Sequence, residues 1–215
     1  LKLFFMTHPS LQSDCELCPR LVDFREDNRA SYPEFHNAPV PSFGTLDARL
    51  LIVGLAPGLK GANQTGRPFT GDYAGDLLYA TLLKFGFATG AYGATAEDGL
   101  KLQDVRITNA VRCVPPQNKP VGAEVKNCRP FLTQEIEAME KLEIILALGT
   151  LAHNGVLSSL GFKQSAAKFG HCKFHELAPD LLLADSYHCS RYNTNTGRLT
   201  EEMFCDVFAA IKERL

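Results

Sequence analysis

The chain has 215 residues, of which 45% are hydrophobic, so it can bury one substantial core, and we predict a single domain over residues 1–215. Its formal net charge of −2 excludes a protein that coats polyanions in general, but not a compact enzyme that holds a few phosphates on one face. No apolar run is long enough to span a bilayer, so we expect no membrane association.

The first ten residues, LKLFFMTHPS, contain no hydrophobic region followed by a cleavage site of small residues. We interpret them as a lead-in to the fold and expect a cytoplasmic protein. The seven cysteines are an odd number in a chain without a recognisable secretory signal, which argues against a disulfide framework.

The predicted elements alternate between strand and helix. The segment LQSDCELCPRLVDF at 11–24 predicts a turn and a short helix, and the charged, proline-containing residues that follow, up to Leu46, predict a surface excursion. Apolar runs predict strands at 50–53, 144–148 and 181–184, and an alternating pattern predicts one at 105–111. Periodicity and capping residues predict helices at 77–85, 123–142 and 151–160, and a last helix that begins after Thr200. This alternation predicts an α/β fold with a parallel sheet and helices on both faces.

A glycine-rich loop joins the first strand to the first of these helices. Its glycines require sharp bends or a close approach to the backbone, and they lie at positions 54, 58, 61, 66, 71 and 75. Gly61 and Gly66 have the spacing of a phosphate-binding P-loop, but Arg67 and Pro68 stand where that motif needs lysine and a hydroxyl residue. The loop therefore predicts a functional site other than a P-loop.

The carboxyl ends of parallel strands meet at one edge of a sheet, and ligands bind there. This rule brings together the glycine-rich loop, the segment around Asn109, Gly149 with Thr150, and the segment around His188. We expect the functional site to be formed by these four segments.

Each candidate side chain in these segments has a functional and a structural interpretation. Asp72 precedes a helix, where it is either an active-site acid or an ordinary N-cap. His188 is either a hydrogen-bond donor to a developing negative charge or a structural histidine. Asn109 either pairs with the edge of a base or ties a loop, and Phe69 is either a stacking surface or a packing residue.

The loop SRYNTNTGR at 190–198 carries two arginines and no acid. Arg191 and Arg198 are suited to phosphate contacts, and Tyr192 is suited to entering a base stack. The alternative is an ordinary exposed loop.

Four cysteines form two pairs far apart in the chain: Cys15 with Cys18, and Cys113 with Cys128. Four thiolates hold either zinc or an iron–sulfur cluster. Zinc ribbons have two tight CxxC pairs, whereas fourteen residues separate the second pair here, which favours the larger cluster. The remaining alternative is four separate buried thiols.

Taken together, these segments resemble the uracil-DNA glycosylase superfamily, and within it the iron–sulfur family 5 (type b) enzymes. The resemblance is carried by CELC at 15–18, VGLAPGLKGANQTGRPFTGDYAGDLLY at 53–79, ITNAVRC at 107–113, Cys128 before RPFL, LALGTLAH at 146–153 and SYHCSRYNTNTGRLT at 186–200. Family 4 enzymes share the cysteines, but their first motif resembles GEAPG and their loop lacks an acid that matches Asp72.

The resemblance implies a three-layer α/β/α domain with a central four-stranded parallel sheet and a 4Fe–4S cluster on the four paired cysteines. It implies excision of uracil and other deaminated or damaged bases from double- or single-stranded DNA, with hypoxanthine, xanthine and ethenocytosine as further candidates. Base flipping would precede cleavage of the N-glycosidic bond, which leaves an abasic site for base excision repair. A prokaryotic, nucleoid-associated monomer without an obligate protein partner is expected.

Carried over by position, the resemblance gives the cavity residues separate roles. Phe69 would stack on the flipped base, Asn109 would read its polar edge, and Gly54 and Ala56 would complete the base-binding site. Asp72 would position or activate water.

The remaining carried-over role falls to His188, which would stabilise charge on the departing base. Cys189 stands where the family usually has proline after this histidine, which puts the orientation of the ring in question. Three alternatives remain: a non-catalytic iron–sulfur module that recognises damaged DNA, an electron-transfer protein, and a glycosylase of the family 4 type that acts on uracil alone.

Overall fold

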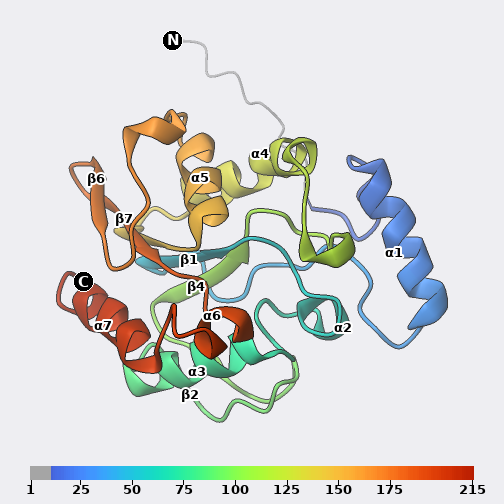
Figure 1. Cartoon of the computed structure of the whole chain (residues 1–215), viewed down its shortest axis with the longest axis horizontal. Coiled ribbons are helices and arrows are strands. Elements are labelled where there is room, and N and C mark those ends of the chain that lie inside the picture. Colours follow the sequence, from blue (N-terminus) through green and yellow to red (C-terminus); the bar gives the residue numbers. More distant parts are fainter. Residues whose placement is uncertain (1–10) are drawn as a thin grey trace.

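The computed structural model describes residues 11–215, so the predicted N-terminal lead-in, LKLFFMTHPS, lies outside the described residues. A five-stranded sheet with the order β4-β1-β5-β7-β6 forms the centre of the molecule (Figure 1). The strands are β1 (Leu50–Gly54), β4 (Val105–Asn109), β5 (Ile144–Leu148), β6 (Phe174–Ala178) and β7 (Leu181–Ser186). The first three and β7 are mutually parallel, which confirms the four predicted strands.

The fifth strand, β6, is an addition to the predicted four-stranded sheet. It pairs antiparallel with β7 and forms the edge, where its residues are partly or fully exposed. The pairing is irregular between Glu176 and Ala178, as is common in edge strands. An antiparallel edge strand on a parallel sheet is a frequent variant of this architecture.

Helices cover both faces of the sheet, which gives the three layers. Successive strand residues point to opposite faces. Leu50 and Ile52 accordingly pack in the cluster that includes α3 (Tyr73–Lys84) and α7 (Glu201–Lys212). Leu51 and Val53 pack in the cluster that includes α4 (Gly122–Ala138) and α5 (Thr150–Ser159). Figure 1 shows the two helix pairs on opposite sides of the strands.

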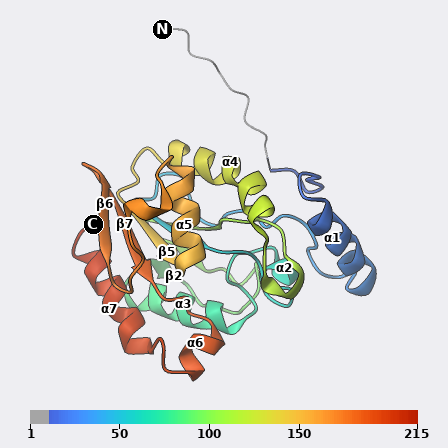
Figure 2. The same cartoon turned by 45° about the horizontal axis from the view of Figure 1, so that its top comes forward.

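The other elements are shorter or lie apart from the sheet. They are α1 (Pro19–Ser31), α2 (Ala62–Thr65), α6 (Arg191–Asn195), the 3-10 turns η1 (Pro116–Asn118) and η2 (Gln164–Ala166), and a hairpin of β2 (Ala88–Thr89) and β3 (Lys101–Leu102). In both views α1 stands at one end of the molecule, beyond α2 and α4 (Figures 1 and 2). It is longer than the short helix that the sequence predicts.

The start of α7 was predicted correctly: Thr200 caps it, since its hydroxyl accepts a hydrogen bond from the Met203 N–H. The helix α4 ends at Ala138 instead of residue 142. We expected Pro130 to mark a helix start or a kink, and it lies inside α4. No helix in the described part of the chain has the length and apolar character needed to cross a membrane. The single domain over residues 1–215 stays a prediction.

Candidate active site

A cavity of about 900 Å³ opens at the carboxyl edge of the sheet. Its walls come from the glycine-rich loop, the end of β4, the 3-10 turn η1 and the segment after β7. Its lining side chains that can take part in chemistry or recognition include Lys60, Phe69, Asp72, Asn109, Asn118, His188 and Arg191. Three of the four predicted segments meet in this cavity, and the segment of Gly149 and Thr150 is not among its lining residues.

Asp72 is both an N-cap and a cavity residue, so its two interpretations hold together. Its Oδ1 accepts a hydrogen bond from the Gly75 N–H at 3.1 Å, which caps α3. Its Oδ2 lies against two glycines of the loop, because a Cβ would come within 3.2 Å of this oxygen at Gly58 and within 2.6 Å at Gly61. One carboxylate oxygen therefore fixes the side chain, and the absence of side chains at Gly58 and Gly61 leaves room for the other.

Phe69 and Asn109 meet over Gly54, the last residue of β1. A Cβ on Gly54 would lie 2.4 Å from Asn109 Oδ1 and 2.5 Å from Phe69 Cζ, so only glycine leaves room for both side chains. The Phe69 ring also faces the His188 ring, with centroids 6.0 Å apart and planes 29° from parallel. An aromatic face, an amide and an imidazole thus lie together on one side of the cavity.

His188 follows β7 directly. Its backbone carbonyl accepts a hydrogen bond from Asn193 Nδ2 at 2.8 Å, and its Nδ1 is buried with no hydrogen-bond partner among the described residues. Burial lowers the pKa of His188, although the negative charge of Asp72 acts in the opposite direction. The imidazole is therefore neutral at neutral pH.

Cys189, the residue after this histidine, is fully buried against α3. Its thiol donates a hydrogen bond to the Ala74 carbonyl of α3 at 3.4 Å. Burial raises the pKa of Cys189, so the thiol stays protonated and remains a donor. The hydrogen bond connects the segment around His188 to α3, the helix that Asp72 caps.

Part of the predicted phosphate-binding loop at 190–198 forms the helix α6. The three candidate residues of this loop do not all lie at the cavity. Arg191 lines the cavity with its guanidinium over the Tyr73 ring, 5.3 Å from the centroid. Tyr192 is 74% exposed beside it. Arg198 does not line the cavity, and its guanidinium lies 4.7 Å from the centroid of Tyr187. Two of the three residues are therefore at or beside the opening, and Arg198 is not.

Asn118, which the sequence patterns did not single out, lines the same cavity. It lies at the end of η1 with a φ of +57°, a conformation that asparagine tolerates better than most residues. An asparagine in a proline-rich turn just beyond a strand end was the available signal.

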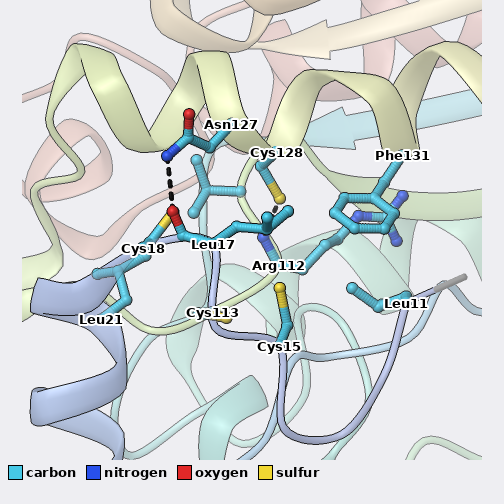
Figure 3. Close-up of a pocket in the computed structure, with 11 residues that line it drawn as sticks. Leu11, Cys15, Leu17, Cys18, Leu21, Arg112, Cys113, Asn127, Cys128 and Phe131 are labelled. Carbon is cyan, nitrogen blue, oxygen red and sulfur yellow. Dashed lines mark hydrogen bonds between the residues drawn. The ribbon is translucent and has the colours of Figure 1, made fainter. Parts of the chain in front are cut away.

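The four paired cysteines also meet, in a separate pocket (Figure 3). Cys15 and Cys18 precede α1, Cys113 follows β4, and Cys128 lies in α4. Apolar side chains, including Leu21 and Phe131, surround them. None of the described cysteines forms a disulfide.

Burial is the largest influence on the pKa of Cys113 and Cys128. Burial and the neighbouring thiols together raise the pKa of Cys113 to about 12 and that of Cys128 to about 11. Backbone and amide groups already donate to the sulfurs: the Arg112 N–H to Cys128 at 3.3 Å, and Asn127 Nδ2 to Cys18 at 3.7 Å. Such thiols lose their protons when a cation binds them.

The spacing of the sulfurs tests which group fits. A tetrahedral zinc site, with Zn–S of about 2.3 Å, would hold its sulfurs within roughly 4 Å of one another. Within the described chain, no three of the four sulfurs lie mutually within 4.8 Å. Four thiols in an apolar pocket at this wider spacing fit a polynuclear group better than a single zinc ion.

Comparison with known proteins decides the family. A model described as the uracil DNA glycosylase superfamily matches residues 41–212. The chain belongs to this superfamily. A type-5 uracil-DNA glycosylase of Thermus thermophilus is 43% identical over 203 residues, which cover 92% of each chain. A type-5 enzyme of Pyrobaculum aerophilum is 40% identical over 198 residues, which cover 90% of this chain and 86% of that one.

The type-4 glycosylases are less similar. A type-4 enzyme of the same Pyrobaculum is 34% identical over 164 residues, which cover 76% of this chain and 68% of that one. The predicted assignment to the type-5 branch of the uracil DNA glycosylase superfamily is confirmed, and so is the predicted α/β fold. The roles of individual site residues stay predictions.

Proposed function

We propose that the protein is a monofunctional DNA glycosylase that hydrolyses the N-glycosidic bond of uracil, and of other deaminated or damaged bases, in base excision repair. The observation that carries the proposal is the shared cavity of Asp72, Phe69, Asn109 and His188 at the carboxyl edge of the sheet. The names of the type-5 relatives point to the same reaction.

A base inside a duplex is out of reach of any cavity, so the substrate nucleotide must be flipped out first, at a cost of a few kcal/mol. The cost is lowest for a mismatched or damaged base. In this proposal the flipped base stacks on Phe69, Asn109 pairs with its polar edge, and Ala56 forms the adjoining wall. Gly54 does not line the cavity itself, but it leaves room for the side chains of Phe69 and Asn109. The stacking and pairing compensate for the lost duplex contacts.

Bond cleavage leaves positive character on the sugar and negative charge on the departing base. The free Oδ2 of Asp72 favours the first and positions water. The neutral His188 ring donates a hydrogen bond that favours the second, because burial keeps its pKa low. Loss of one such contact typically costs on the order of a hundredfold or more in rate.

DNA would be held beside the cavity opening. In this proposal Arg191, which lines the cavity, contacts a phosphate, and the exposed Tyr192 enters the base stack from which the nucleotide has left. Arg198 would contact a phosphate further from the lesion. We propose action on both double- and single-stranded DNA by a cytoplasmic monomer that needs no protein partner.

We further propose that Cys15, Cys18, Cys113 and Cys128 hold a 4Fe–4S cluster with a structural role. Their donor chemistry, their apolar surroundings and the wide spacing of their sulfurs support this assignment. The bound group would supply four metal–thiolate bonds that join the segment before α1 to β4 and α4. A brown protein with broad visible absorbance is expected, and a colourless protein that contains zinc would contradict the cluster.

Release of the base from labelled oligonucleotides tests the proposed reaction. The substrates carry uracil, hypoxanthine, xanthine or ethenocytosine, in single and double strands, with a thymine strand as the control. We expect uracil excision and a heat-labile abasic site. Tight binding of lesion DNA without release would support the non-catalytic recognition module, and excision of uracil alone would support a family 4-like specificity.

A further inference from the structure

The backbone of Phe69 is in a conformation that costs free energy. Its φ is +53°, in the left-handed region that bulky side chains avoid, yet the residue is 7% exposed and its ring is held over Gly54. Such a residue persists only where surrounding contacts over-determine its position. The contacts that fix Phe69 therefore also fix the ring that faces the cavity.

The residues on either side of Phe69 are tied down individually. Tyr79 donates its hydroxyl proton to the Pro68 carbonyl at 2.7 Å, and the Arg67 Nε–H donates to Thr70 Oγ1 at 2.8 Å. The Phe69 carbonyl lies so close to α3 that a Cβ on Gly75 would be 1.7 Å from it. These contacts leave the turn at 67–70 little freedom.

Arg67 is the residue through which this turn is anchored to the rest of the fold. Its two terminal nitrogens donate to the Asp98 carboxylate at 2.8 and 2.6 Å, and only 4% of each side chain is exposed. The rings of Phe43, Tyr79 and Tyr92 surround the guanidinium, with centroids 5.0, 5.2 and 5.8 Å from its central carbon. This aromatic cage and the paired carboxylate hold the guanidinium on several sides.

Asp98 is fixed in turn by its own loop. It accepts hydrogen bonds from the N–H groups of Gly93 at 2.9 Å and Leu100 at 3.0 Å. The hydrogen bonds from Arg67, supported by those from the two backbone groups, hold its pKa far below the usual range against the effect of burial. Neither Asp98 nor Arg67 lines the cavity.

We propose that the Arg67–Asp98 ion pair is a positioning element that sets the orientation of the Phe69 ring, and through it the orientation of the flipped base. The inference rests on the proposed function, because it assigns Phe69 the role of stacking surface. Arg67 and Asp98 do not touch the substrate. Their effect passes through the 67–70 turn to the Phe69 ring, which faces His188 in the cavity.

A double-mutant cycle tests the proposal. Asp98→Asn keeps the shape of the side chain but removes its charge, and Phe69→Leu removes the ring. We expect Asp98→Asn to lower the single-turnover rate of uracil excision by on the order of tenfold or more with little change in DNA affinity, since misplacing a group that touches the substrate by about 1 Å can cost a hundredfold. In the Phe69→Leu background the same change should alter the rate by less than about twofold.

Equal losses in the two backgrounds would overturn the proposal, because a general structural effect does not depend on the Phe69 ring. Equal rates for Asp98→Asn and the parent protein would overturn it as well. Asp104→Asn is the control. Asp104 also pairs with an arginine, Arg49, at 2.6 Å, but this pair lies at the amino-terminal ends of β1 and β4, away from the cavity. If Asp98→Asn does not fold, Asp98→Glu takes its place, because it keeps the charge and moves the carboxylate by one methylene.

A second readout does not need catalysis. The 14 phenylalanines are replaced by 4-fluorophenylalanine, and the fluorine resonance of residue 69 is identified by its absence in Phe69→Leu. We expect this resonance to shift and broaden in Asp98→Asn and in Arg67→Lys but not in Asp104→Asn. A parent protein without excision activity would contradict the proposed function, whereas an unchanged resonance would contradict the positioning role.

Discussion

At the residue scale, the two oxygens of Asp72 have separate tasks. Asn is also a good N-cap, so Asp72→Asn keeps the hydrogen bond to the Gly75 N–H and removes only the charge beside Gly58 and Gly61. We expect single-turnover excision to fall on the order of a hundredfold or more, with DNA affinity nearly intact. Equal rates for the two proteins would refute the role of the acid.

His188 makes a prediction about pH. Burial places its pKa below the ordinary value of 6.5, so the ring gains a proton only on the acid side of that value. A glutamine at this position donates a hydrogen bond but does not titrate. The ratio of the parent rate to the His188→Gln rate should therefore stay constant from pH 6.5 to 8.5. A step in that ratio within this range would mean that the pKa is raised instead.

At the scale of elements, the glycine-rich loop determines where the N-terminus of α3 can place its acid. A Cβ on Gly61 would lie 2.6 Å from Asp72 Oδ2, too close for the carboxylate to keep its position. We predict that Gly61→Ala lowers the excision rate by on the order of tenfold or more through displacement of the carboxylate. The control is Gly122→Ala, where nothing lies within 4 Å of the new methyl group. Similar rates for the two variants would contradict the prediction.

A buried network joins α5, β6 and β7 beside the site. His153 Nδ1 lies 2.7 Å from Asp185 Oδ1, His153 Nε2 lies 3.0 Å from the Ala167 carbonyl, and His175 Nε2 lies 3.0 Å from Asp185 Oδ2. A carbonyl oxygen accepts and a carboxylate oxygen accepts a donated proton, so this arrangement favours the protonated ring of His153, in which both nitrogens donate. Burial lowers the pKa of His153, but the hydrogen bonds to Asp185 and Ala167 outweigh it, and the pKa is raised.

This network predicts how stability depends on pH. Because the folded pKa of His153 is raised, its contribution is fully present below the ordinary pKa of 6.5 and is lost as the pH rises through the raised value. The parent should therefore exceed His153→Gln in thermal midpoint by more at pH 6 than at pH 9. Subtracting the two curves removes the other titrating groups. A difference that is constant or larger at pH 9 would contradict the protonated state.

At the scale of the whole molecule, the sequence was sufficient to predict the parallel strands and the place of the cavity. The two central strands β1 and β5 are continuous apolar runs buried on both faces, and the rule for strand ends predicts the place of the cavity. The edge strand β6 was missed because FHELA is short and charged, and its pairing partner β7 determines it. The His153–Asp185 pair was missed because 32 residues separate its members and no local pattern connects them.

The length of α1 could not be predicted for a different reason. Beyond Phe24 the helix is polar, and it buries Arg25 and Asn28 instead of an apolar stripe. Arg25 Nη1 donates to the Cys15 carbonyl at 3.0 Å, and Asn37 Nδ2 donates to the Asn28 carbonyl at 3.3 Å. Such contacts exist only after the cysteine turn and the following loop have folded around the helix.

Because α1 buries little apolar surface, we expect its attachment to the rest of the protein to depend on the cysteines. Leu21 is its only buried apolar side chain. Its other ties to the body of the protein are polar. They include the Arg20–Glu124 pair at 2.7 Å, in which Arg20 is 42% exposed, and the hydrogen bond from Arg29 Nε to the Asn37 carbonyl at 3.2 Å. We therefore expect metal–thiolate bonds at Cys15 and Cys18 to contribute a large share of the attachment.

We predict that loss of the bound group releases α1 while the sheet stays folded. In Cys113→Ser, trypsin should cut within residues 19–31, where Arg20, Arg25 and Arg29 are available, and a fragment that contains residues 50–212 should resist. Visible absorbance, measured in parallel, should be lost in the same variant. Cys172→Ser is the control, because Cys172 is exposed and lies outside the cysteine pocket, so that variant should keep both its colour and its protected helix. A helix that stays protected after the colour is lost would show that Leu21 and the polar contacts hold α1 without the metal–thiolate bonds.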